Sequence, residues 1–298
     1  METTLLIDAK NTAYRALFAS RGERDLRNGH YHPFTTWLRF THVWLEKFKP
    51  DSVHVFWDCN KNDVWRRKVL AEYKQHRDDL PAYSDDIQHE LHQLISAAMD
   101  MIPHMGMRQY YRDSQESDDL IYAACRVMTP CSTSERRVIV ISSDSDFMQL
   151  KWTMPHVSVY LPCKNCFAEH PICNPAIQKA LCGDKSDNIE GYRGIGPVKS
   201  RQLTEDNKKL IEFIDLAGAQ KFKRNLALID LSMNPAHLSN ELYVLRETTK
   251  DVSYDSKVLG EMAMKHKVRG WMSEYPKMAV AFKRLTASMP AESQPAHQ

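Results

Sequence analysis

The pattern of apolar and polar positions along the chain predicts an α/β fold with a mostly parallel central sheet flanked by helices. Short apolar runs occur at residues 3–7, 53–57 and 138–141, and such runs are typical of strands that are buried on both faces. Between the first two runs, apolar residues recur at helical spacing from residue 34 to residue 48. Strand, helix and strand in this order predict a βαβ unit.

The same pattern predicts the remaining elements. Further helices are expected at residues 11–19, 87–99 and 120–128, a short strand at residues 157–160, and several helices between residues 210 and 285. Polar residues predict a loop at residues 21–32 and a turn at residues 78–86. The last dozen residues are rich in Pro, Ala, Ser and Gln, which predicts a disordered tail.

Acidic residues follow each of the three main predicted strands. Asp8 ends the first strand, Asp58 ends the second, and Asp144 with Asp146 follows the third. Ligands of open α/β sheets bind outside the carboxyl ends of the strands, so we expect these carboxylates to lie together. More acidic residues precede a predicted helix and a glycine-rich turn: Glu116, Asp118, Asp119, Asp184 and Asp187.

A single aspartate in such a place commonly caps the next helix, but this number of acids needs another explanation. Two like charges about 4 Å apart repel by about 4 kcal/mol at an effective dielectric of about 20. Several such pairs would rival a net domain stability of roughly 5–15 kcal/mol. Either some of these acids stay protonated or divalent cations neutralise them. The second is the usual solution, and oxygen ligands suit Mg²⁺ or Mn²⁺. We therefore predict two metal ions that serve phosphodiester hydrolysis.

Two basic segments accompany the acids. Residues 61–77 interleave Lys and Arg with Trp and Tyr, which is typical of phosphate contacts and base stacking, although any one of these lysines alone would indicate only a solvated surface. Gly191, Gly194 and Gly196 then form a turn into a helix that carries Lys199 and Arg201. Such a turn offers backbone N–H groups to a phosphate and carbonyls to a monovalent cation; a plain helix–turn–helix corner is the alternative.

Composition and cysteine usage narrow the class of protein. The 298-residue chain carries 40 Lys and Arg against 38 Asp and Glu, and this balance does not exclude a nucleic-acid partner because the acids cluster at strand ends.

No apolar run reaches membrane-spanning length and the first residues lack the basic start of a signal peptide, so we expect a cytoplasmic protein and no membrane partner. Seven scattered cysteines favour reduced thiols. Zinc-ligand types occur at compressed spacing, but we expect no zinc at Cys163, Cys166, His170 and Cys173.

Taken in order, six motifs resemble the phage and bacterial 5′-nucleases, the flap endonuclease and 5′→3′ exonuclease superfamily, and within it the ribonucleases H of T-even phages. The resemblance covers roughly residues 5–231. It is carried by Leu-Ile-Asp8, by Asp58 with Trp-Arg-Arg67 and Tyr-Lys-x-x-Arg77, by Glu116-x-Asp-Asp119, by Ile-Ser-Ser-Asp-x-Asp-Phe147, by Gly-Asp-x-x-Asp-Asn188 and by Asn225-Leu-Ala-Leu-Ile-Asp230.

The resemblance implies roles for individual residues. The first metal site would be formed by Asp8, Asp58, Glu116 and Asp118. The second would be formed or supported by Asp119, Asp144, Asp146, Asp184 and Asp187, with Asp118 as a bridge. Lys74 would reach the scissile phosphate, so the implied catalytic set is Asp8, Asp58, Lys74, Glu116, Asp118 and Asp144. Nucleic acid would be bound by Arg66, Arg67, Tyr73, Lys74, Arg77, Gly191, Gly194, Ile195, Gly196 and Lys199.

The resemblance also implies an organisation and a function. We expect an α/β nuclease core at residues 1–182 with an open or closed arch at about residues 76–106, a helix–three-turn–helix with a helical C-terminal part at residues 183–286, and the tail at residues 287–298. The cofactors would be two Mg²⁺ ions, with Mn²⁺ as a substitute, and K⁺ at the helix–three-turn–helix. The implied activity is removal of RNA primers and adjoining DNA and cleavage at 5′ flaps, with a single-strand-binding protein and a sliding clamp as partners in phage-type replication.

The sequence departs from the family pattern after Asp58, and two other functions have to be weighed against the nuclease. Cys59 and Asn60 stand where many relatives have a small residue and a Gly-Lys pair, which leaves the role of Lys61 open. An Asp-nucleophile phosphatase also has an aspartate at its first strand end, but it usually needs a second two residues later, where this chain has Lys10. A metal-free DNA-binding module would lack some of the carboxylates, and none is missing.

Overall fold

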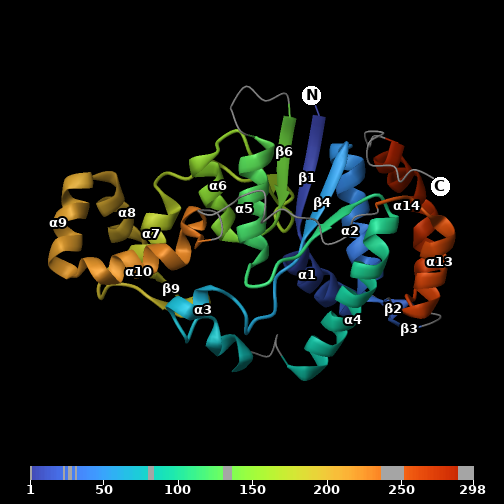
Figure 1. The fold of residues 1–298 in the computed structure, drawn as a ribbon, viewed down its shortest axis with the longest axis horizontal. Coiled ribbons are helices and arrows are strands. Elements are labelled where there is room, and N and C mark those ends of the chain that lie inside the picture. Colours follow the sequence, from blue (N-terminus) through green and yellow to red (C-terminus); the bar gives the residue numbers. More distant parts are fainter. Residues whose placement is uncertain are drawn as a thin grey trace.

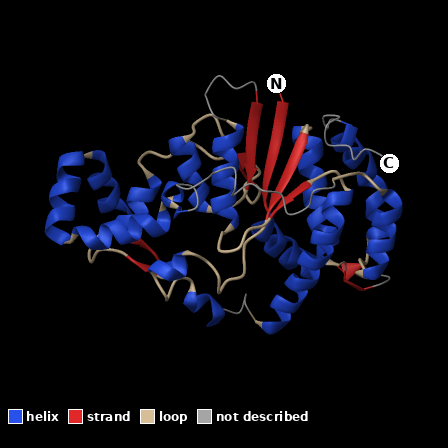
Figure 2. Cartoon of the chain, viewed as in Figure 1, coloured by secondary structure: helices blue, strands red, loops and turns tan. Residues whose placement is uncertain are grey.

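A computed structural model describes residues 2–22, 24–25, 29–30, 32–79, 84–129, 136–235 and 252–287. A six-stranded sheet lies at its centre, with helices on both faces (Figures 1 and 2). In spatial order the strands are β5 (Arg108–Tyr110), β4 (Ser52–Phe56), β1 (Glu2–Asp8), β6 (Arg136–Ile141), β7 (Ser158–Leu161) and β8 (Cys166–Phe167). The first five are parallel and β8 is antiparallel to β7, which confirms the predicted fold class.

The register of the three central strands brings their carboxyl ends to one edge. Ile7 of β1 pairs with Val55 of β4 on one side and with Ile141 of β6 on the other. The segments that follow these strands therefore leave the sheet side by side. This is why acids that are far apart in the sequence meet in space.

Alternate residues of the strands enter two separate cores. Leu5 and Ile7 pack into the larger core and Leu6 packs into the smaller one, and all three are 0% exposed. The larger core is covered by α1 (Ala9–Gly22), α2 (Pro33–Phe48), α4 (Asp85–Met101), α13 (Ser256–Lys265) and α14 (Trp271–Ala287). The smaller core is covered by α5 (Ser117–Met128) and α6 (Met148–Thr153). Burial on both faces explains the uninterrupted apolar runs of the strands.

Helix α2 shows how local sequence produces an element. Pro33 occupies the first turn, where its missing N–H costs nothing, and the ring nitrogen Nδ1 of His32 accepts a hydrogen bond from Phe34 N at 3.2 Å. The predicted apolar stripe is buried, with Trp37 at 0% and Trp44 at 4% exposed. The helix ends at Lys49, which has a left-handed φ of 45°.

A group of helices extends from one end of the sheet, on the left of Figure 1. It consists of α7 (Pro175–Cys182), α8 (Pro197–Glu205), α9 (Asn207–Ala217) and α10 (Ala219–Ile229). The small elements of the chain are α3 (Arg66–Val69), the ribbons β2 (Arg24–Asp25) with β3 (Gly29–His30) and β9 (Gly183–Asp184) with β10 (Ile189–Glu190), and the 3-10 helices η1 (Gln75–Asp79), η3 (Ile102–His104), η4 (Ser145–Phe147), η5 (Lys185–Asp187) and η6 (Leu231–Met233).

Several predicted segments differ from the structure or lie outside it. The segment 21–32 was predicted as a loop and contains the β2–β3 ribbon, while short strands such as β5 were not predicted. Residues 80–83 of the predicted turn and 288–298 of the predicted tail lie outside the described residues. Helices α13 and α14 pack into the larger core, next to α2 and α4. The division of the chain at residue 182 stays a prediction.

Candidate active site

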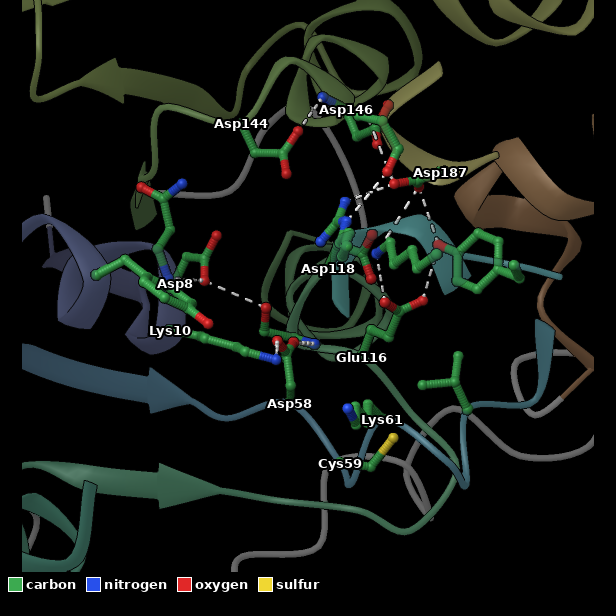
Figure 3. A pocket seen from close by; sticks show the side chains of 18 of the residues that line it. Asp8, Lys10, Asp58, Cys59, Lys61, Glu116, Asp118, Asp144, Asp146 and Asp187 are labelled. Atoms are coloured by element: carbon green, nitrogen blue, oxygen red, sulfur yellow. Dashed lines mark hydrogen bonds and ion pairs between the residues drawn. The ribbon is translucent and has the colours of Figure 1, made fainter. Parts of the chain in front are cut away.

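A cavity of about 330 Å³ lies at the carboxyl ends of β1, β4 and β6 (Figure 3). Seven of the predicted acidic residues line it: Asp8, Asp58, Glu116, Asp118, Asp144, Asp146 and Asp187. Lys74, Arg67, Tyr73 and Arg77 of the basic segment line it as well. The acids that follow the three strands in the sequence therefore meet in one cavity, as the strand-end pattern predicts.

Asp8 is the most buried of the strand-end acids, at 5% exposed. Its carboxylate accepts hydrogen bonds from Ser142 Oγ at 2.9 Å and Ser117 Oγ at 3.2 Å. Burial, followed by the nearby charges of Asp58 and Asp144, raises the pKa of Asp8 to about 7. Burial and the neighbouring negative charges together therefore outweigh the hydrogen bonds that Asp8 accepts.

The pKa of Asp58 is shifted in the opposite direction from that of Asp8. Burial raises its pKa, but this is outweighed by the Lys10 ammonium at 3.1 Å and by the Ser117 N–H at 2.7 Å, so the pKa falls to about 2. Lys10 lies in the first turn of α1, two residues after Asp8. It occupies the place where a phosphatase would carry its second aspartate.

The start of α5 holds three acids in different environments. Glu116 is the N-cap, and Asp119 closes a capping box by accepting from Glu116 N at 3.1 Å. Asp119 is 0% exposed, and its two oxygens are held by Arg66 at 2.9 Å each. Asp118 is half-buried on the cavity side, and burial raises its pKa well above the ordinary value.

Two residues of the basic segment are buried rather than presented to solvent. Arg66 is 1% exposed and Tyr73 is 2% exposed. The Arg66 guanidinium also donates to Glu116 Oε2 at 2.8 Å, and the Tyr73 hydroxyl donates to Glu116 and Asp187 at 3.1 and 3.0 Å. These contacts hold carboxylates in place. Tyr73 lines the cavity whereas Arg66 does not, and the contact of each with nucleic acid stays a prediction.

A second acidic group consists of Asp146, Asp184 and Asp187, whose oxygens come within 4.8 Å of one another. Burial and the charge of Asp144 raise the pKa of Asp146 to about 6. Lys179 of α7 donates to Asp146 Oδ1 at 2.6 Å and to Asp184 Oδ2 at 2.7 Å. Sequence reasoning missed Lys179, because a lone lysine on a helix carries no motif.

Lys74 connects the first acidic group, which consists of Asp8, Asp58, Glu116 and Asp118, with the second, and Arg77 bonds the second group. Lys74 Nζ lies 2.5 Å from Glu116 Oε1 and 3.7 Å from Asp187 Oδ2. Arg77 donates to Asp187 Oδ1 at 2.6 Å. Lys74 has a positive φ of 57° and its backbone N–H donates to Asp187 O, which fixes the direction of the side chain.

The glycine turn lies outside the cavity, before α8. Gly191 packs so closely on the Cys182 backbone that an added Cβ would lie 2.2 Å from its carbonyl. Gly194 and Gly196 have open space around them and are exposed, as is Lys199, while Ile195 is half-buried. Exposed backbone at a helix start is available to a phosphate or to a cation.

The cysteine-containing segment does not assemble a ligand set. Cys163 and Cys166 are exposed, Cys173 is buried, and the His170 ring lies beside Trp152 at 5.7 Å. Within the part of the chain that the structure describes, the groups of metal-ligand side chains are the two acidic ones. Elemental analysis of purified protein tests the expectation that no stoichiometric zinc is present. None of the described helices is both long and apolar enough to span a membrane.

The fold and the cavity define a class of proteins that bind divalent cations at the end of a parallel sheet. Comparison with known proteins gives the family. A family model described as 5′-3′ exonuclease, N-terminal resolvase-like domain, matches residues 3–176. This chain belongs to that 5′-3′ exonuclease family.

Individual relatives agree with this assignment. The chain is 30% identical over 219 residues to a 5′-3′ exonuclease of Mycoplasma pneumoniae, which covers 68% of this chain and 72% of that protein. It is 28% identical over 246 residues to DNA polymerase I of Streptococcus pneumoniae, covering 74% of this chain but only 26% of the polymerase. A solved structure of the phage T5 5′-exonuclease with bound zinc ions has the same fold, with a TM-score of 0.65 and 17% identity over 93% of this chain and all of that one. The resemblance to 5′-nucleases is thereby confirmed.

Proposed function

We propose that this chain is a two-metal 5′-nuclease that hydrolyses phosphodiester bonds at the 5′ ends of DNA and RNA–DNA duplexes and at 5′ flap junctions. The observation that carries this proposal is the cavity in which seven carboxylates from separate segments meet. The relatives that are named 5′-3′ exonuclease and flap endonuclease support the choice of substrate. A structural neighbour, the catalytic core of Rad2 in complex with a DNA substrate, has a TM-score of 0.51 and supports the fold.

The residues fit divalent cations in particular. Asp8, Asp118 and Asp144 have no ion-pair partner within the described residues, and burial raises the pKa of the first two. Carboxylates that are held close together without a cation are the donor set that Mg²⁺ or Mn²⁺ prefers. Asp8, Asp58, Glu116 and Asp118 would hold one ion, and Asp146, Asp184 and Asp187 would hold the other. Asp144, which the resemblance assigns to the second ion, raises the pKa of both Asp8 and Asp146 and would lie between the two ions. Bound ions supply the Lewis acidity for phosphodiester hydrolysis.

Other side chains would place the substrate. Lys74 lies between the two acidic groups, so an incoming phosphate would meet its ammonium at the point where both groups act. Arg67 and Arg77 line the same cavity and add positive charge along the backbone of the polynucleotide. Asp119 and Arg66 act behind the cavity, where they fix the start of α5. The glycine turn with Lys199 would hold the duplex, with K⁺ as its cation.

The test is cleavage of a 5′-labelled RNA–DNA duplex and of a 5′-flap duplex, with Mg²⁺ and with EDTA. We expect Mg²⁺-dependent products from the 5′ end or near the flap junction. Asp144→Asn should abolish cleavage and retain flap binding, whereas Asp206→Asn, at the exposed N-cap of α9, should cut at the wild-type rate. Tight flap binding without any cleavage by the wild type would favour the DNA-binding module instead. Binding to a single-strand-binding protein or a sliding clamp and a cytoplasmic location stay predictions.

A further inference from the structure

The two acidic groups differ in how they are neutralised by the chain itself. In the second group each aspartate has an ion-pair partner: Lys179 bonds Asp146 and Asp184, and Arg77 bonds Asp187. In the first group Lys10 bonds Asp58, and Arg66 and Lys74 bond Glu116, but Asp8 and Asp118 have no ion-pair partner within the residues that the structure describes, and neither has Asp144, which lies between the groups. This asymmetry is a property of the fold, because Lys179 comes from α7 and the three unpaired acids come from other elements.

Lys179 is built into its position. Its ammonium lies 2.6 Å from Asp146 and 2.7 Å from Asp184, and the side chain is only 24% exposed. Asn174 caps α7 through hydrogen bonds to Ala176 N and Ile177 N, and Ala180, the next residue on the helix, is 0% exposed in the core. The backbone that carries Lys179 is therefore fixed, while the flexible side chain can leave the acids.

We infer that Lys179 is an internal counter-cation that occupies the second acidic group, so that a divalent cation binds there only by displacing it. The first group then binds its cation tightly in the free enzyme, and the second binds weakly until something draws Lys179 away. A phosphate of the substrate is a suitable attractor, because it offers the displaced ammonium a new anionic partner. Lys179 is thus a positioning residue that orders assembly of the site, an inference that rests on the proposed two-metal function.

The experiment is calorimetric titration of Mn²⁺ into the full chain, without nucleic acid. The wild type should show one tight site and a second site at least about tenfold weaker. Lys179→Met should tighten the second site at least about tenfold, the equivalent of one charge-assisted hydrogen bond, and leave the first unchanged.

Lys179→Arg keeps the charge and should keep the weak second site, which a purely structural role of lysine would not predict. Lys185→Met is the matched control and should behave as the wild type, because Lys185 is exposed next to Asp184 and forms no ion pair with any residue that the structure describes.

The possible failures are distinguishable. Two sites whose affinities are unaltered in Lys179→Met, or a second site that weakens in it, overturn the inference and leave the nuclease proposal standing. No Mn²⁺ binding by the wild type contradicts the proposed function itself. Thermal melting in EDTA first establishes that each variant folds. If Lys179→Met does not fold, Lys179→Gln gives the same comparison, because it removes the charge and keeps a polar side chain that can donate a hydrogen bond.

Discussion

Replacing Arg66 with methionine tests how the start of α5 is held. The guanidinium is 1% exposed and donates to Glu116, to both oxygens of Asp119 and to the carbonyl oxygen of Leu228, at 2.8–2.9 Å. Methionine fills part of this space but leaves Asp119 as a buried charge without its partner. Removing one member of a buried ion pair costs about 3–5 kcal/mol. That is a large share of a net stability of roughly 5–15 kcal/mol.

The assay is equilibrium unfolding in urea with EDTA, followed by circular dichroism. With a denaturant slope of about 2–3 kcal/mol per molar urea, the midpoint should fall by about 1–2 M. Arg136→Met is the matched control. Arg136 bonds Glu2 at 2.8 Å, but these side chains are 38% and 45% exposed, and an exposed pair contributes at most about 1 kcal/mol.

The result that would refute this reasoning is a loss of stability in Arg66→Met no larger than in Arg136→Met. The double variant Arg66→Met with Asp119→Leu should recover much of the loss, because both members of the buried pair are gone. If duplex binding falls while the unfolding midpoint of Arg66→Met stays at the wild-type value, Arg66 contacts nucleic acid, as the sequence predicts.

Asp8, Lys74 and Gly191 each give a further prediction. Because burial and neighbouring charges raise the pKa of Asp8 from 3.8 to about 7, its contribution to stability is lost as the pH rises through 7, by about 1 kcal/mol between about pH 6.5 and about pH 8.5. Burial lowers the pKa of His32 to about 4 and of His54 to about 3, and these residues contribute about the same amount with the opposite sign over this range, so Asp8→Asn is the reference. In EDTA the melting temperature of the wild type should fall by about 2–4 °C more over this range than that of Asp8→Asn, a difference that Mg²⁺ should remove, and an equal pH dependence of the two proteins would contradict the raised pKa. Lys74→Ala should slow single-turnover cleavage at least about 100-fold and change flap affinity by less than about threefold; a large loss of binding at an unchanged rate would make Lys74 a gripping residue. Gly191→Ala should cost about 1–3 kcal/mol in urea unfolding, because its Cβ would lie 2.2 Å from the Cys182 carbonyl, whereas Gly196→Ala has open space and should match the wild type.

The strands and their terminal acids are predictable because the rule behind them is local. A buried apolar run predicts a parallel strand, and the acid that follows it must lie at the carboxyl edge of the sheet. Asp8, Asp58 and Asp144 are far apart in the chain, but they needed no long-range information to be placed together. The helix with Glu116 follows the same logic, since its first turn points at the same edge.

The buried members of the basic segment were not predictable in this way. Arg66 and Tyr73 have the residue types of a nucleic-acid surface, and Lys61 and Lys68 in the same segment are indeed exposed. Their burial depends on the end of α10, whose Leu228 carbonyl accepts from Arg66 across 162 positions of sequence. Lys179 reaches Asp146 across 33 positions, from a helix that no motif marks. The amphipathic stripes of α13 and α14 likewise do not show that these helices pack into the larger core, against α2 and α4.

These internal cations change the electrostatic argument for metal binding. Counting acids along the sequence predicts repulsion that either protonation of some acids or bound divalent cations would relieve. In the folded chain, six of the nine acids have an ion-pair partner: Asp58, Glu116, Asp119, Asp146, Asp184 and Asp187. The acids without an ion-pair partner among the described residues are Asp8, Asp118 and Asp144. Burial, and after it the charges of neighbouring acids, raises the pKa of Asp8 and of Asp118. The case for a divalent cation therefore rests on these three residues, and a cation bound beside them would relieve more charge than one bound anywhere else in the cavity.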